Sequence, residues 1–298
     1  MTLAVAFRRK PDGPFVREAR RRWVQVDGET RVLARENDRP GAPTAVVVHG
    51  LTSDADTALS VGYARALYER GFRTVRLNQR NFGGTELDTP TLSHAGLVDD
   101  LAALVRDLVA ERPGAPIYLT GFSMGGNVCL RYLGLGLAPD EVKAAAVTAP
   151  AVDLGAASRA LPWVYDRYFV RELTSLYVRK AAHFADRYDP GRMRGVRSVR
   201  AFDEAAVVPG FGFEDVDDYY HRASSLPVLG RVDRPCLVLV ADDDPIVPAH
   251  SFDAPVFQRP ELQVQRTRSG GHVGWIASGW RYWAERRIAS WLGDLAFD

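Results

Sequence analysis

The sequence is short of cysteine and contains no long hydrophobic run. Its 298 residues include two cysteines, Cys129 and Cys236, which are too few for a disulfide scaffold or a four-cysteine zinc site. Both have apolar neighbours, so we expect buried free thiols in a reducing compartment. The longest apolar stretches, such as residues 45–48 and 237–240, are far below the roughly 18 residues of a membrane helix. We therefore expect no transmembrane segment.

Lysine is also scarce, although the charges balance. The chain has 38 basic and 37 acidic residues and a net charge of +1. This balance argues against an acidic disordered chain, against a dedicated nucleic-acid binder and for a neutral substrate. The only lysines are Lys10, Lys143 and Lys180, so nearly all the positive charge is carried by arginine.

The arginines gather in two clusters, at residues 8–22 and 187–200. One hypothesis is peripheral contact with an anionic membrane surface. The alternative is ion pairing, because an acidic stretch at residues 203–218 follows the second cluster. At the N-terminus a few apolar residues precede Arg8, the reverse of the order in a signal peptide, so we expect a cytoplasmic protein.

Strand and helix patterns alternate along most of the chain. Strands are predicted at residues 22–26 and 30–34 (a hairpin), 44–48, 72–77, 117–120, 142–148, 236–240 and 262–266. Helices are predicted at residues 57–70, 93–111 (with Ser93 as N-cap), 124–133, near 249, and from 275 to about 292. This order predicts an α/β fold, with a mostly parallel central sheet and helices on both faces.

The alternation stops between residues 151 and 232. This stretch holds 12 of the chain's 30 aromatic residues, so we interpret it as an inserted lid or cap over a pocket. The predicted catalytic core then consists of residues 1–150 and 233–298.

A nucleophile motif follows the strand at residues 117–120. Gly121-Phe122-Ser123-Met124-Gly125 fits the pattern G-x-S-x-G, and a helix follows it. In this context the pattern predicts a tight strand-to-helix turn that exposes Ser123 as a nucleophile. Side chains at positions 121 and 125 would collide with neighbouring backbone. The glycine spacing matches neither a dinucleotide-binding loop nor a phosphate-binding loop.

A serine nucleophile needs a base, and His272 is the best placed of six histidines. It lies in a glycine-rich loop after the last predicted strand, in the required order serine, acid, histidine. His49 ends a buried strand and is predicted to support the neighbouring loop. His183, His221 and His250 are predicted to be surface or packing residues.

The orienting acid is expected after the strand at residues 236–240, where three aspartates follow one another. We predict Asp244, which precedes Pro245 and is therefore extended, with Asp243 as the alternative. The oxyanion hole needs two backbone N–H groups. The first is that of Met124, and the second is that of Leu51, with Thr52 as the alternative.

These residues, with the segments 49–52, 78–85, 93–96, 202–203 and 270–274, resemble the α/β-hydrolase superfamily, and within it the YheT-like esterase/acyltransferase family. The resemblance runs from about residue 20 to the C-terminus. It implies an α/β-hydrolase fold and a triad of Ser123, Asp244 and His272. It also implies reaction at medium-chain or lipid-like acyl esters. One departure is Asn81, where the family more often has glycine.

The sequence thus predicts a serine esterase that works through an acyl-enzyme intermediate. The alternatives are acyl transfer to an alcohol and a catalytically silent binding protein with the same fold. No metal-ligand spacing such as H-E-x-x-H is present, and nothing indicates an organic cofactor.

Overall fold

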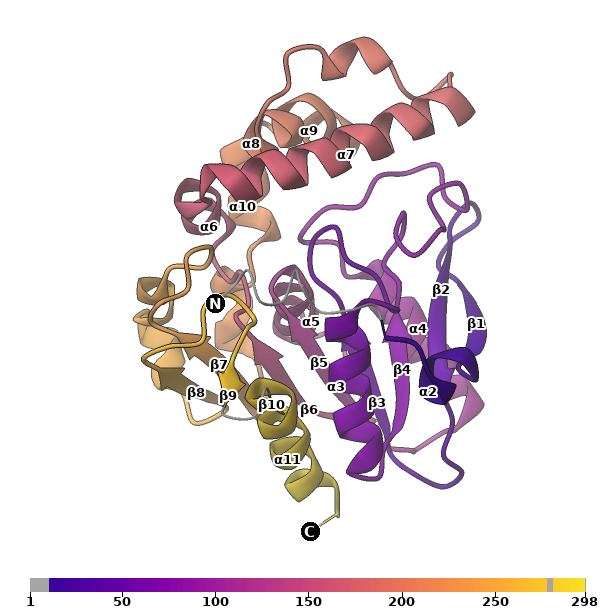
Figure 1. Ribbon diagram of the computed structural model, residues 1–298, viewed down its shortest axis with the longest axis vertical. Helices are drawn as coiled ribbons and strands as arrows, with labels where there is room; N and C mark the ends of the chain where they lie inside the picture. The colour runs from indigo at the N-terminus through magenta and orange to yellow at the C-terminus, as the bar shows by residue number, and fades with distance from the viewer. Residues whose placement is uncertain (1–10, 278–280, 298) are drawn as a thin grey trace.

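A single mixed sheet forms the centre of the molecule (Figure 1). The computed structural model describes residues 11–277 and 281–297, and in this part eight strands pair in the order β1-β2-β4-β3-β5-β6-β7-β8. The β1–β2 and β2–β4 pairs are antiparallel, and all pairs from β4 to β8 are parallel. The strands are β1 (Arg20–Gln25), β2 (Arg31–Asn37), β3 (Thr44–Val48), β4 (Arg73–Leu77), β5 (Ile117–Phe122), β6 (Val142–Thr148), β7 (Cys236–Ala241) and β8 (Leu262–Thr267). The mostly parallel sheet is confirmed.

The central strands are apolar because helices cover both faces of the sheet. On one face α3 (Ala58–Glu69) and α11 (Trp283–Phe297) pack together. On the other face lie α4 (Asp99–Glu111) and α5 (Met124–Gly134). Cys129 and Cys236 are buried free thiols in this second core, as predicted, and burial raises the pKa of Cys236 to about 12.

Two predicted helix starts are wrong. Helix α4 begins at Asp99 and not at Ser93, because the backbone groups of Ala95 bond to other parts of the chain. The Ala95 N–H donates to the Tyr219 hydroxyl (2.9 Å), and the Ala95 carbonyl accepts from the Asn127 side chain (3.0 Å). Helix α11 begins at Trp283 and not at Trp275, whose φ of 35° is incompatible with a right-handed helix. Part of that predicted helix, residues 278–280, lies outside the described residues.

Between β6 and β7 the chain leaves the sheet and forms a helical layer across its upper end (Figure 1). We refer to residues 154–231 as the cap segment. It contains α6 (Leu154–Ala160), α7 (Trp163–His183), η1 (Pro190–Met193), α8 (Val199–Phe202), the π-helix η2 (Asp203–Val207), α9 (Val208–Phe211), α10 (Val216–Ala223) and η3 (Leu226–Arg231). Short elements elsewhere are α2 (Pro14–Arg17), η4 (Ala249–Phe252), η5 (Pro255–Gln258), β9 (Ile276–Ala277) and β10 (Arg281–Tyr282).

A buried lysine joins the cap segment to the core by hydrogen bonds. Lys180 of α7 donates hydrogen bonds to the Asn81 side chain (2.8 Å) and to the carbonyls of Glu86 (2.9 Å) and Thr89 (2.6 Å). Burial lowers the pKa of Lys180 to about 8. Asn81 has a φ of 72°, a left-handed conformation that favours glycine and that asparagine also tolerates. This conformation accounts for the glycine that the related family more often has there.

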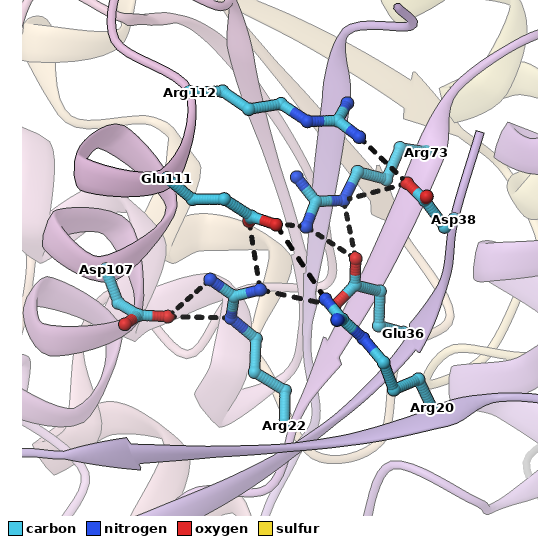
Figure 2. Close-up of polar contacts among 8 residues, drawn as sticks. All are labelled: Arg20, Arg22, Glu36, Asp38, Arg73, Asp107, Glu111 and Arg112. Atoms are coloured by element: carbon cyan, nitrogen blue, oxygen red, sulfur yellow. Dashed lines mark hydrogen bonds and ion pairs between the residues drawn. The ribbon is translucent and has the colours of Figure 1, made fainter. Parts of the chain in front are cut away.

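The abundance of arginine has a structural use at the edge of the sheet. Figure 2 shows Glu36 of β2 contacted by Arg73 of β4 (2.8 Å) and by Arg20 (2.8 Å) and Arg22 (3.3 Å) of β1. The Arg73 side chain is 1% exposed, and it also contacts Glu111 of α4 at 2.7 Å. A planar guanidinium can donate hydrogen bonds to two carboxylates at once, and a lysine ammonium is less suited to this. The network joins three strands and a helix.

Two arginines of the second cluster form ion pairs, and one of these pairs lies within the inserted stretch, as the alternative hypothesis predicted. Arg200 pairs with Asp217 at 2.7 Å, and Arg187 pairs at 2.7 Å with Glu29, which lies outside the acidic stretch. The predicted ion pairing is wrong for Asp203. This residue is buried and accepts a hydrogen bond from Tyr220, and no ion pair to it occurs in the described part of the chain. The first cluster begins outside the described residues.

Candidate active site

Ser123 lies at the turn between β5 and α5, as the G-x-S-x-G motif predicts. Its φ of 54° and ψ of −124° are strained for a residue with a side chain. The turn is fixed on both sides: the Ser123 N–H donates to the Thr148 carbonyl at the end of β6 (2.9 Å), and the Ser123 carbonyl accepts from Asn127 (3.1 Å). The side chain is therefore held above the carboxyl end of the sheet.

The glycines of the motif are required by close backbone contacts. A Cβ atom on Gly121 would overlap the carbonyl of Gly125, and one on Gly125 would overlap the carbonyls of Val48 and His49. These are rigid backbone atoms that cannot rotate away. The predicted collisions at positions 121 and 125 are confirmed.

Ser123, His272 and Asp244 form one hydrogen-bonded chain. His272 Nε2 lies 2.8 Å from Ser123 Oγ, and His272 Nδ1 lies 2.9 Å from Asp244 Oδ2. The Asp244 carboxylate can only accept, so Nδ1 carries the proton and Nε2 is free to accept from the serine hydroxyl. The structure therefore brings together the three side chains that the sequence selected.

Asp243 performs a different task from Asp244. Its Oδ1 accepts hydrogen bonds from the N–H groups of Gly270 and Gly271, both at 2.7 Å. Asp244 uses its other oxygen, Oδ1, to accept from Ile246 (2.8 Å) and Val247 (3.0 Å). Asp243 thus anchors the loop that carries the histidine, whereas Asp244 contacts the imidazole itself.

The remaining histidines lie away from the serine hydroxyl or have other partners. His49 is buried and neutral: its Nε2 accepts from the Gln79 N–H (3.1 Å), and its Nδ1 donates to the Gly50 carbonyl (2.8 Å). Burial lowers its pKa to about 4. His49 thus supports the loop after β3, as predicted. The surface assignments are also confirmed, since His183, His221 and His250 are exposed.

The loop after β3 runs directly beside the nucleophile. A Cβ atom on Gly50 would lie 3.2 Å from Ser123 Cβ, which leaves little room for a side chain. The next residues are Leu51 and Thr52, the two sequence candidates for the second oxyanion donor. In the described part of the chain, no hydrogen bond uses the N–H of Leu51 or of Met124. Both amides are therefore available to an oxygen at this site.

A cavity of about 720 Å³ opens above Ser123, between the sheet and the cap segment. Ser123, His272, Leu51 and Met124 line its floor, and most other lining side chains are apolar. Its volume is in the usual range for small-molecule sites. The apolar residues from the cap segment that line it include Leu154, Leu161, Val164, Phe169, Leu173 and Val207.

The sequence assigned no role to two further polar residues of this cavity. Asp203 and His94 both line it. His94 packs against the rings of Phe211 (4.5 Å), Phe213 (5.6 Å) and Tyr219 (5.7 Å), and burial lowers its pKa to about 3. A lone aspartate or histidine carries no signal of such a position, because the contacts come from distant parts of the chain. No group of three or more potential metal ligands occurs among residues 11–277 and 281–297.

A mostly parallel sheet that presents a serine on a strand-turn-helix, with a histidine on the loop after the last parallel strand, defines the α/β-hydrolase class. The family described as alpha/beta hydrolase fold matches residues 43–277, and the chain belongs to it. It is 30% identical over 291 residues to YheT of Escherichia coli, covering 95% of this chain and 82% of that protein. The resemblance to that family is therefore confirmed.

Other relatives are named as lipases. Phospholipase ABHD3 of Mus musculus is 31% identical over 82% of this chain, and the monoacylglycerol lipase of Saccharomyces cerevisiae is 27% identical over 84% of it. The chain spans 61% and 59% of the lengths of these two proteins. The Pyrococcus furiosus esterase Pf2001 has the same fold, with a TM-score of 0.64 at 16% identity over 95% of this chain and 96% of that one.

Proposed function

We propose that this protein hydrolyses carboxylic esters through Ser123, His272 and Asp244. The observation that carries the proposal is the continuous hydrogen-bonded chain of these three side chains on the floor of a largely apolar cavity. The esterase and lipase names of its relatives support the same reaction type. We expect a metal-free and cofactor-free mechanism.

In the first half-reaction, Ser123 Oγ attacks the ester carbonyl carbon while its proton moves to His272 Nε2. The Asp244 carboxylate stabilises the imidazolium that forms. The tetrahedral intermediate then collapses, the bond to the alcohol breaks, and His272 returns the proton to the leaving alcohol. Water attacks the resulting acyl-enzyme by the same route, which releases the carboxylic acid and restores Ser123.

The oxyanion of each intermediate is assigned to the N–H groups of Leu51 and Met124. Met124 is the first residue of α5, so the helix dipole adds to the attraction for negative charge. The close approach of Gly50 to Ser123 supports Leu51 as the second donor. Each such donor typically contributes a factor of about 10² to 10³ to kcat.

We assign medium-chain or lipid-like acyl groups to the cavity, and we propose that residues 151–232 act as its lid. The apolar side chains of α6, α7 and η2 that line the cavity suit an acyl chain. On α7, Val164 and Tyr168 line the cavity and are also exposed, and the neighbouring Trp163 is 73% exposed. These side chains would favour substrates presented at a lipid surface, which supports peripheral contact. Among the helices described, none is long and apolar enough to cross a bilayer.

The test is a series of p-nitrophenyl esters of increasing acyl length, combined with a fluorophosphonate probe. The wild-type protein should hydrolyse the medium-chain members and be labelled at Ser123. The Ser123→Ala variant should lose both the activity and the label while keeping its melting temperature. If no ester is turned over, or if Ser123→Ala remains active, the proposal is wrong.

A further inference from the structure

A buried carboxylate in the cap segment lines the cavity and forms no ion pair with the described residues. Asp203 is 7% exposed and lines the cavity. Its Oδ2 accepts a hydrogen bond from the Tyr220 hydroxyl at 2.8 Å. Within the described residues no hydrogen bond reaches its Oδ1, and no arginine or lysine forms an ion pair with it; Arg200, which pairs with Asp217, acts on it from a greater distance. One carboxylate oxygen is therefore available to a ligand.

The charged groups around the cavity have one sign. Asp54, Asp56 and Asp203 line it, and no arginine or lysine of the described chain does so. The Arg35 guanidinium, at 3.1 Å, offsets the charge of Asp56. This one-sided lining contrasts with other parts of the described chain, where carboxylates pair with arginine, such as Asp88 with Arg31 and Asp217 with Arg200.

Aromatic side chains adjoin Asp203, and others line the same cavity. Phe202 precedes it in the chain, Tyr220 bonds to it, and the Tyr219 and Tyr220 rings are 5.1 Å apart. Tyr165, Tyr168 and Phe169 of α7 line the cavity as well. Aromatic faces together with a carboxylate are the groups that recognise quaternary ammonium ions in proteins.

The physical chemistry favours a cationic occupant over a neutral or an anionic one. A buried carboxylate without an ion-pair partner is costly, and its burial raises the pKa of Asp203 to about 7. A hydroxyl group would bond to Oδ1 and leave the charge uncompensated. An anionic group would be repelled by Asp203 and Asp54. An ammonium group would compensate the charge of Asp203 and contact the aromatic rings.

We propose that the cavity accepts esters whose alcohol part carries an ammonium group, which binds between Asp203 and the surrounding aromatic side chains. This inference rests on the proposed ester hydrolysis at Ser123 and names the substrate class for it. The apolar lining from Leu154, Leu161 and Leu173 is then left for the acyl chain. Asp203 contacts the substrate away from the reacting carbonyl, so it determines specificity and is not part of the chemistry.

The test compares two esters that differ only in charge: butyrylcholine and its carbon isostere, 3,3-dimethylbutyl butyrate. We expect the wild-type kcat/KM to be roughly 10- to 100-fold higher for the cationic ester, the range typical of a desolvated cation beside a carboxylate and aromatic rings. Asp203→Asn keeps the shape and an acceptor for Tyr220, so it should reduce the preference, measured as the ratio of the two kcat/KM values, to about one.

The pH dependence of the preference gives a second readout. The ratio of the two kcat/KM values cancels the titration of the catalytic groups, which both esters share. This ratio should rise as pH increases through about 7 in the wild-type protein, where Asp203 ionises, and stay flat in Asp203→Asn. The other ionisable groups that act on Asp203 are Tyr220 of α10, Arg200 of α8 and Asp166 of α7.

Binding can be measured without turnover. Choline should inhibit hydrolysis of p-nitrophenyl butyrate at least tenfold more strongly than 3,3-dimethylbutan-1-ol, its neutral isostere. Calorimetry on Ser123→Ala protein should give the same order of affinity. These measurements need no Asp203 variant, so they test the proposal even if Asp203→Asn fails to fold.

The outcomes separate the two proposals. If neither ester nor any p-nitrophenyl ester is hydrolysed, the proposed function fails. If the neutral isostere and butyrylcholine are hydrolysed with equal kcat/KM, the ester hydrolysis stands and the cation site is wrong. An equal loss of both activities in Asp203→Asn would assign Asp203 a structural role and also overturn the inference.

Discussion

The adjacent aspartates Asp243 and Asp244 allow a sharp test of the proposed mechanism. In Asp244→Asn, an amide replaces the carboxylate that accepts the hydrogen bond from His272 Nδ1. The distance between Nδ1 and Asp244 Oδ2 is 2.9 Å. The amide can donate to Nδ1, which favours the tautomer with the proton on Nε2, and that tautomer cannot accept from Ser123. We expect kcat to fall about 10³- to 10⁴-fold. This loss corresponds to about 4 to 5.5 kcal/mol of barrier.

Asp243→Asn is the matched control, because it changes the neighbouring residue in the same way. An asparagine carbonyl can still accept from Gly270 and Gly271, but it lacks the charge. Charge-assisted hydrogen bonds are stronger than neutral ones by about 1 kcal/mol each. We therefore expect a lower melting temperature and a loss of kcat of about tenfold or less.

The assay is steady-state hydrolysis of p-nitrophenyl butyrate by both variants, with melting curves to show that each is folded. The reasoning is refuted if Asp243→Asn loses as much activity as Asp244→Asn. It is also refuted if folded Asp244→Asn keeps more than a tenth of the wild-type kcat. The first result would mean that the two aspartates do not have the different tasks described, and the second that the Asp244–His272 contact does not set the tautomer.

Three further predictions concern stability. Gly125→Ala should lower the free energy of unfolding in urea by about 3 kcal/mol or more and reduce esterase activity, because the new methyl group overlaps rigid backbone; an unchanged free energy would contradict the geometry of the turn at Ser123. Glu36→Gln should lower the free energy of chemical unfolding by about 3 kcal/mol, because it leaves the charge of buried Arg73 less compensated. Asp294→Asn, at an exposed ion pair, should lower it by less than about 0.5 kcal/mol. Equal effects would refute the role of burial. Asp203 has a raised pKa when folded, so its folded form keeps a proton that the unfolded form has lost, and it destabilises the fold increasingly as pH rises from about 4 to about 7. Asp203→Asn should therefore gain stability relative to wild type across that range and show a constant difference above it, and a difference independent of pH would show that Asp203 is not buried as described.

The sequence predicted the parts of this protein that depend on local patterns. Runs of apolar residues predicted the positions of the parallel strands, and the spacing of Gly121 and Gly125 around Ser123 identified the turn. Chain order then selected His272 and left a choice between Asp243 and Asp244. These inferences succeed because strands, turns and the order of loops along one sheet edge are encoded in short segments.

The sequence failed where distant contacts override local preference. Ser93 has the chemistry of a helix N-cap, yet the neighbouring Ala95 N–H bonds to Tyr219, which is 124 residues away. Trp275 follows a helix-compatible pattern, but its indole N–H bonds to Thr267 (2.9 Å) and its ring packs over Gly270. Asp203 resembled a member of an acidic surface stretch, and only the folded cap segment places it in the cavity.

The buried lysine of α7 provides a built-in chemical reporter. Lys143 is exposed on β6, whereas Lys180 is enclosed between α7 and the loop after β4. An amine-acylating reagent followed by mass spectrometry should therefore modify Lys143 at once and Lys180 only when the two layers separate. Because lysine is so scarce, the two sites can be resolved without labels or mutations. The ratio of the two modifications would report whether the cap segment separates from the core.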